Sequence, residues 1–151
     1  MLIDTAPGID EDVLYLNSAA DEVSIVLTPD PASVLDSYAL IKVLSSKYKA
    51  VEFSIIINSV KDEKESIRIF KAISDMAEEN LLVHLRYLGY IPYDQQLRYA
   101  VKSRKLVTAT SPKSSSSLAI EKLSKNMTDF KGVEKINGGL QVFWKQMLSV
   151  A

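Results

Sequence analysis

Residues 22–27 of this chain read EVSIVL and residues 28–31 read TPDP, and these two pieces together decide the fold class. A nearly continuous apolar run is typical of a strand that is buried on both faces, as in a parallel sheet. Asp30 is placed to cap a helix whose first residue is Pro31, and this predicted helix continues to about residue 46. A buried strand that leads directly into a helix is the repeating unit of α/β proteins.

The same alternation of strand and helix extends on both sides of this stretch. Upstream, the sequence predicts a short strand at residues 2–3 and a helix over residues 10–20. Downstream, it predicts strands at 52–58 and 84–91, helices at 62–79, 95–102 and 115–126, and a small extended piece at 106–107. The expected fold is therefore an α/β fold with a mostly parallel sheet and flanking helices.

Composition excludes several classes of protein. The 151 residues suit one domain, and 47% of them are hydrophobic, as in an ordinary globular protein. There is no Cys and a single His, His84, so disulfides, thiolate chemistry and a Ser-His-Asp triad are not expected. No apolar run approaches the ~20 residues of a transmembrane helix, and no basic leader is present, so the prediction is a cytoplasmic protein.

The first motif that carries chemistry is residues 2–9, LIDTAPGI. Asp4 follows the predicted strand, and the carboxyl ends of strands are where open α/β sheets bind ligands. There a carboxylate could act on Mg²⁺ through a bound water, and the amide of Gly8 could approach a terminal phosphate. A plain turn with an Asp and a Pro-Gly pair is the alternative interpretation.

Three further segments follow in order: residues 26–38, VLTPDPASVLDSY; residues 55–60, IIINSV; and residues 89–94, GYIPYD. Together with the first motif, they resemble the MinD/ParA family of ATPases, and most closely the branch that regulates flagellar number. The resemblance extends from Leu2 to the C-terminus.

The resemblance implies ATP and Mg²⁺ as the cofactors of the parent family. It implies that Asp4 is the catalytic acidic residue on the magnesium side, which acts on the metal through water, and that residues 5–8 sense the terminal phosphate. It also implies that Asn58 reads adenine and that Ile91 and Pro92 lie beside the base. Without the family, Asn58 would be interpreted as a turn former and Ile91–Pro92 as an ordinary end of a strand.

The chain departs from the family in one essential part. Phosphate-loop ATPases bind phosphates with a Gly-rich loop that ends in Gly-Lys-Ser/Thr, and no Gly-Lys pair occurs in these 151 residues. We therefore expect a C-terminal part of such an ATPase that does not hydrolyse ATP and does not bind it on its own. In the family the absent strand lies between residues 2–3 and 22–27, so exposed strand edges and a homodimer are expected.

The C-terminal segment, residues 131–151, predicts a linker and an amphipathic helix that follow an ATPase-like domain over residues 1–130. Its apolar residues fall on one helical stripe: Ile136, Leu140, Phe143, Trp144, Met147 and Leu148. With Lys131, Lys135 and Lys145 nearby, this stripe suits reversible binding to an anionic membrane, and the resemblance favours the same role. A last helix docked on the core or on a partner is the alternative.

Two functions from different classes remain open. The first is part of a regulator of flagellar number or placement that dimerises with ATP at the inner face of the membrane, with flagellar assembly or transcription partners. The second is a non-catalytic interaction module that acts through its surface or its last helix. The basic residues Arg98, Lys102, Arg104 and Lys105 are interpreted as a solvated face, and no nucleic acid partner is expected.

Overall fold

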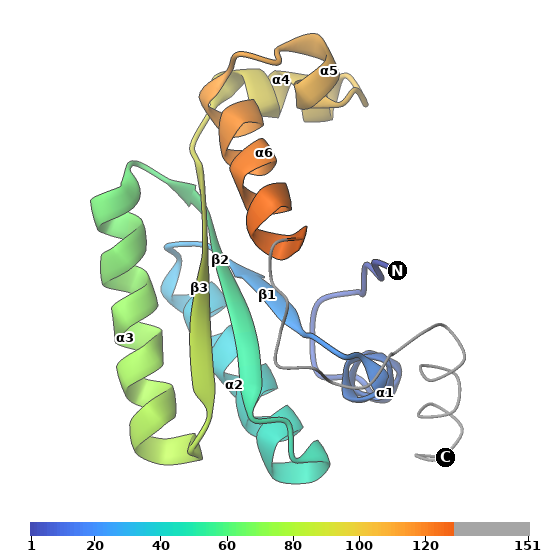
Figure 1. The fold of residues 1–151 in the computed structure, drawn as a ribbon, viewed down its shortest axis with the longest axis vertical. Helices are drawn as coiled ribbons and strands as arrows, with labels where there is room; N and C mark the ends of the chain where they lie inside the picture. Colours follow the sequence, from blue (N-terminus) through green and yellow to red (C-terminus); the bar gives the residue numbers. More distant parts are fainter. Residues whose placement is uncertain (129–151) are drawn as a thin grey trace.

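A computed structural model describes residues 1–128 of the chain (Figure 1). Helices and strands alternate as the sequence predicts. In chain order they are α1 (Glu11–Ala19), β1 (Ser24–Leu27), α2 (Pro31–Tyr48), β2 (Glu52–Val60), α3 (Glu63–Leu81), β3 (His84–Pro92), α4 (Gln95–Lys102), α5 (Val107–Thr110) and α6 (Ser115–Thr128). The segment 131–151, with the predicted apolar stripe from Ile136 to Leu148, lies outside the described residues.

The three strands form one parallel sheet in the order β1-β2-β3. Ile25 on β1 lies opposite Ile55 on β2, and Ile55 lies opposite Tyr87 on β3. The predicted α/β class with a parallel sheet and flanking helices is confirmed.

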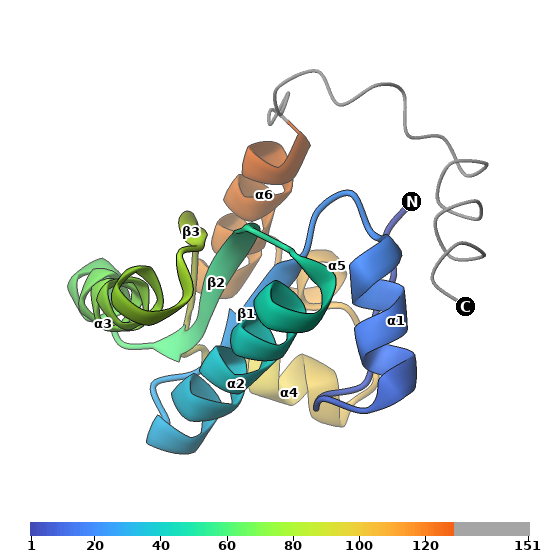
Figure 2. The ribbon, with the colours of Figure 1, turned by 90° about the horizontal axis from the view of Figure 1, so that it is seen from below.

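Two helices cover one face of the sheet and build the main core. Figure 2 shows α2 and α3 on the same side of the sheet, with α6 on the other side. Alternate strand residues point toward α2 and α3 because successive side chains of a strand face opposite sides. The fully buried members of this core are Leu27, Ile41, Leu44, Ile55, Ile57, Val60, Ile73 and Ala77.

The opposite face is covered by α6 over β2 and β3. Leu123 of α6 packs with Ile56 and Leu88 in a second, smaller core. Gly89 has a φ of +145°, and a Cβ there would lie 2.9 Å from the Leu123 side chain. A glycine at this position therefore provides both the backbone conformation and the close approach of α6. Within residues 1–128, α6 does not extend over β1 on this face, and Val26 is 56% exposed.

Two sequence-based predictions of local structure are wrong. Residues 1–10 contain no helix or strand, so Leu2 and Ile3 form no strand. A strand needs a hydrogen-bonded neighbour, and the described part of the sheet ends at β1. The predicted extended piece at Leu106–Val107 is also wrong, because the carbonyl of Leu106 accepts from the amides of Ala109 and Thr110 and begins the helical turn α5.

Within residues 1–128, no helix combines the length and the apolar character that crossing a bilayer requires.

Candidate functional site

The carboxyl edge of β2 and β3 brings three of the predicted site residues together. Asn58 lies opposite Ile91 in the strand register, and Val60 lies opposite Pro92. Between Asn58 and Val60 the register shifts, and Ser59 takes a left-handed φ of +61°. This irregularity ends the regular ladder at the edge where ligands bind in open parallel sheets.

Asn58 has the chemistry that recognition of a base requires. Its side chain is half-buried, and its amide makes no hydrogen bond within residues 1–128. A carboxamide offers a donor and an acceptor at once, as the edge of a purine does. The described residues therefore fit the adenine side of a nucleotide site.

The other two predicted residues lie in the N-terminal segment, which runs beside α1 (Figure 1). Asp4 and Gly8 are both exposed, and a Cβ on Gly8 would have nothing within 4 Å. Across residues 1–128, no group of three Asp, Glu or His side chains could hold a metal ion. The role of Asp4 on the magnesium side stays a prediction.

A feature that the sequence analysis missed lies immediately after this edge. One oxygen of Asp94 accepts from the amide of Gln96 at 2.8 Å, at the start of α4. The other oxygen accepts from the amide and the hydroxyl of Ser116 at 3.0 and 2.8 Å, at the start of α6. One carboxylate thus joins the first turns of two helices. These hydrogen bonds, the one from the Ser116 amide first, hold the pKa of Asp94 well below its ordinary value.

A second polar cluster crosses the sheet at its amino end. Ser54 on β2 donates to Glu22 at 2.7 Å and accepts from Arg86 on β3 at 2.7 Å, and Arg86 also pairs with Glu22. Through these contacts the cluster links β2 and β3 to Glu22, which precedes β1.

The fold is that of the MinD class of phosphate-loop NTPases. Its similarity to the MinD cell division protein of Aquifex aeolicus has a TM-score of 0.56, at 22% identity over 80% of this chain and 49% of that one. No known family profile matches the chain.

Sequence comparison narrows the class. The chain is 30% identical over 148 residues to the antiactivator FleN of Pseudomonas aeruginosa, which covers 98% of this chain and 53% of FleN. It is 31% identical over 152 residues to the flagellum site-determining protein YlxH of Helicobacter pylori, covering 98% of this chain and 51% of YlxH. These similarities support a fragment of a MinD/ParA protein of the FleN-like kind, and the chain spans about half the length of the relatives it matches.

Proposed function

We propose that this chain acts in the regulation of flagellar number or placement, as part of a MinD/ParA-type switch. The observation that carries the proposal is its similarity, over 98% of its length, to FleN and YlxH, which are named as an antiactivator and as a flagellum site-determining protein. Partners of flagellar assembly or transcription follow from the same similarity.

In this proposal the chain contributes the adenine side of an ATP site. Asn58 hydrogen-bonds the base, and Ile91 and Pro92 line the edge beside it, which is supported by their juxtaposition in the register of β2 and β3. ATP, when bound, provides the group whose hydrolysis drives the switch. These 151 residues include no Gly-Lys-Ser/Thr loop, so another segment or chain must cradle the phosphates before hydrolysis can occur.

The free edge of β1 supports a proposal of association. Within the described sheet β1 pairs with β2 alone, so its outer edge presents unpaired backbone groups. Such an edge is a template for another strand, and each buried polar group left unpaired would cost about 1–3 kcal/mol. We expect a homodimer, or pairing with the segment that carries the phosphate loop.

The proposal also includes binding to a membrane. The protein would be cytoplasmic and would associate peripherally with the inner face of the membrane. The apolar stripe that includes Phe143 and Trp144 would insert into the interface, with nearby lysines meeting anionic lipid. This stripe lies outside the described residues, so its support is the sequence pattern.

The function is tested by deleting the gene in its host cell and counting flagella per cell by electron microscopy. We expect an altered number or placement, restored by the wild-type gene supplied from a plasmid. Unchanged flagella in the deletion strain would contradict the proposed function, since the number would then not depend on this chain.

A non-catalytic interaction module remains the second candidate, and the open β1 edge with the exposed face of Val26 favours it. The two candidates differ in nucleotide chemistry. Only the first requires that Asn58 contribute to ATP binding once the phosphates are held.

A further inference from the structure

The end of the molecule formed by residues 93–113, here called the basic end, has a strong and uncompensated positive charge. It contains α4 and α5 and carries five Lys/Arg side chains: Arg98, Lys102, Arg104, Lys105 and Lys113. All five are exposed, and none forms an ion pair with a carboxylate in residues 1–128. The one acidic residue of this stretch, Asp94, is occupied by the starts of α4 and α6.

Large apolar side chains are exposed on the same end. Tyr99 is 71% exposed, Val101 is 66% exposed and Leu106 is 74% exposed. Val101 and Leu106 lie directly beside the cations Lys102 and Lys105 in sequence. These side chains give the basic end exposed apolar groups beside its charges.

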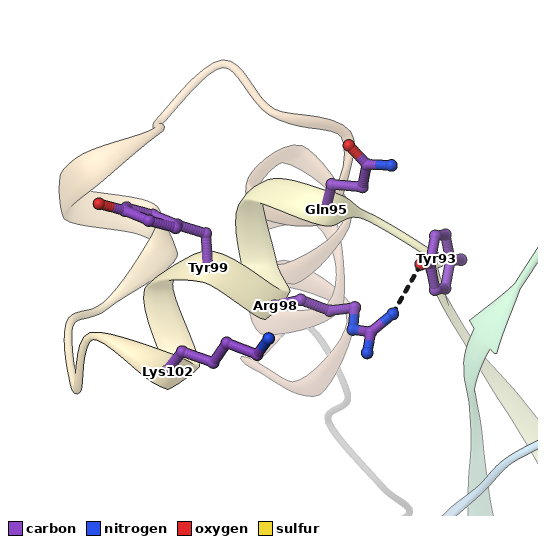
Figure 3. Close-up of a pocket in the computed structure, with 5 residues that line it drawn as sticks. All are labelled: Tyr93, Gln95, Arg98, Tyr99 and Lys102. Carbon is purple, nitrogen blue, oxygen red and sulfur yellow. Dashed lines mark hydrogen bonds between the residues drawn. The ribbon is translucent and has the colours of Figure 1, made fainter.

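Aromatic rings and cationic side chains lie next to one another on α4 and just before it. Arg98 donates to the hydroxyl of Tyr93 at 2.9 Å, and its guanidinium lies 5.8 Å from the centre of that ring. Figure 3 shows Gln95, Arg98, Tyr99 and Lys102 projecting from the single helix α4, where with Tyr93 they line a shallow pocket. Positions 95, 98, 99 and 102 follow helical spacing, so they form one stripe of the helix.

The basic end also projects from the rest of the fold. Figure 1 shows α4 and α5 beyond the upper end of the sheet, while α1 lies toward the other end of the long axis. Residues 1–22, which include α1, contain six Asp/Glu and no Lys or Arg, so an acidic segment lies away from the basic end. A flat anionic surface would attract the basic end and repel this acidic segment.

We propose that the basic end docks on the anionic headgroups of a lipid bilayer, with its cations at the headgroups and Tyr99 and Leu106 in the interfacial layer. Lys and Arg near an anionic leaflet attract it, and tyrosines and small apolar side chains partition into the interface. A surface that projects beyond the sheet can touch a flat bilayer. Phosphates of nucleic acid would satisfy the cations but would leave the aliphatic side chains in water.

The basic end is formed by other residues than the C-terminal stripe of the proposed function. A protein held at both places would bind with higher overall affinity than either contact provides alone, because the second contact becomes intramolecular. The inference therefore adds a second membrane contact and does not depend on the first.

The test is co-sedimentation of the full chain with vesicles of phosphatidylglycerol and phosphatidylcholine, with pure phosphatidylcholine vesicles as the neutral reference. We expect Lys102→Glu/Lys105→Glu to weaken binding at least about tenfold, and Lys102→Gln/Lys105→Gln to weaken it less. The matched control is Lys64→Glu/Lys71→Glu on α3, which makes the same change of charge at exposed lysines and should bind nearly as the wild type does.

A second variant separates lipid from a soluble anion. Leu106→Asn keeps every charge, so it should weaken vesicle binding severalfold and leave the binding of soluble polyglutamate unchanged. Each variant is also measured in a Phe143→Glu background, where the C-terminal stripe is disabled. If Lys102→Glu/Lys105→Glu weakens vesicle binding in that background, the result supports membrane binding by the basic end. If Phe143→Glu alone weakens vesicle binding, the result supports membrane binding by the C-terminal stripe.

Three results would overturn the inference. The first is equal vesicle binding by the wild type and Lys102→Glu/Lys105→Glu in the Phe143→Glu background. The second is an equal loss in the Lys64→Glu/Lys71→Glu control, because bulk charge would then explain the binding. The third is a variant effect on polyglutamate or single-stranded DNA without an effect on vesicles. Thermal unfolding of each variant checks that the fold is retained.

Discussion

Replacing Asp94 with alanine is expected to lower the free energy of unfolding by about 2–3 kcal/mol, because its single carboxylate caps two helices and each cap contributes about 1 kcal/mol. The amide of Gln96 and the amide of Ser116 would both lose their acceptor. Ser116 is fully buried, so water cannot easily replace the lost bond, and this raises the cost. Equilibrium unfolding in urea measures the change.

Two variants serve as controls for this prediction. Asp62 caps α3 alone, through the amide of Glu65 at 2.9 Å, so Asp62→Ala should cost about 1 kcal/mol. Asp94→Asn retains one carbonyl acceptor and should fall between the wild type and Asp94→Ala. A loss for Asp94→Ala that is no larger than the loss for Asp62→Ala would show that the double cap does not stabilise α6.

The same carboxylate predicts a dependence of stability on pH. The hydrogen bonds from Ser116 lower the pKa of Asp94 in the folded state, so its contribution is complete above the unfolded-state pKa. It is lost progressively as the pH falls below about 4 toward the folded-state value. The stability difference between the wild type and Asp94→Ala should therefore be constant near neutral pH and shrink in acid. If the stability difference between the wild type and Asp94→Ala grew as the pH fell, the prediction would be contradicted.

The second large effect is expected from Leu123→Ala, which should lower the free energy of unfolding by about 2–4 kcal/mol. Leu123 is 6% exposed and joins α6 to Ile56 and Leu88, in the small core on that face of the sheet. Neighbouring atoms cannot easily refill the space, because Gly89 beside it has no side chain. Urea unfolding again gives the value.

Leu118→Ala on the same helix is the matched control, since Leu118 is 55% exposed and its loss should cost less than about 1 kcal/mol. If both variants lost the same stability, helix propensity and not packing against β2 and β3 would account for the effect. If Leu123→Ala were neutral, α6 would not depend on this contact.

Much of the fold could be predicted from the sequence, because its signals are local. The helix predicted over residues 95–102 is found with these bounds, as α4. The run at 52–58 is found as β2 with two further residues. Local sequence signals could not decide whether residues 2–3 form a strand, because a strand forms only where a neighbouring strand pairs with it.

The candidate site could also be predicted only in part. The place of Asn58 beside Ile91 followed from the family resemblance, whereas the left-handed Ser59 between Asn58 and Val60 has no signal in the residue type. The second cap of Asp94 comes from Ser116, 22 positions further along the chain, and no periodic pattern connects them. Glu22, Ser54 and Arg86 meet only after the strands pair, although polar residues within buried strand runs could have indicated such a cluster.

The most direct test of the central claim, that this chain holds the adenine side of a MinD/ParA-type site without its phosphate side, is calorimetric titration with ATP and Mg²⁺. We expect no micromolar binding to the chain alone. A fusion that places a family segment with the Gly-Lys-Ser/Thr loop ahead of Met1 should bind ATP, and Asn58→Ala in that fusion should weaken binding about tenfold through the lost hydrogen bonds. Micromolar binding by the chain alone, or equal affinity of the fusion with and without Asn58→Ala, would contradict the account.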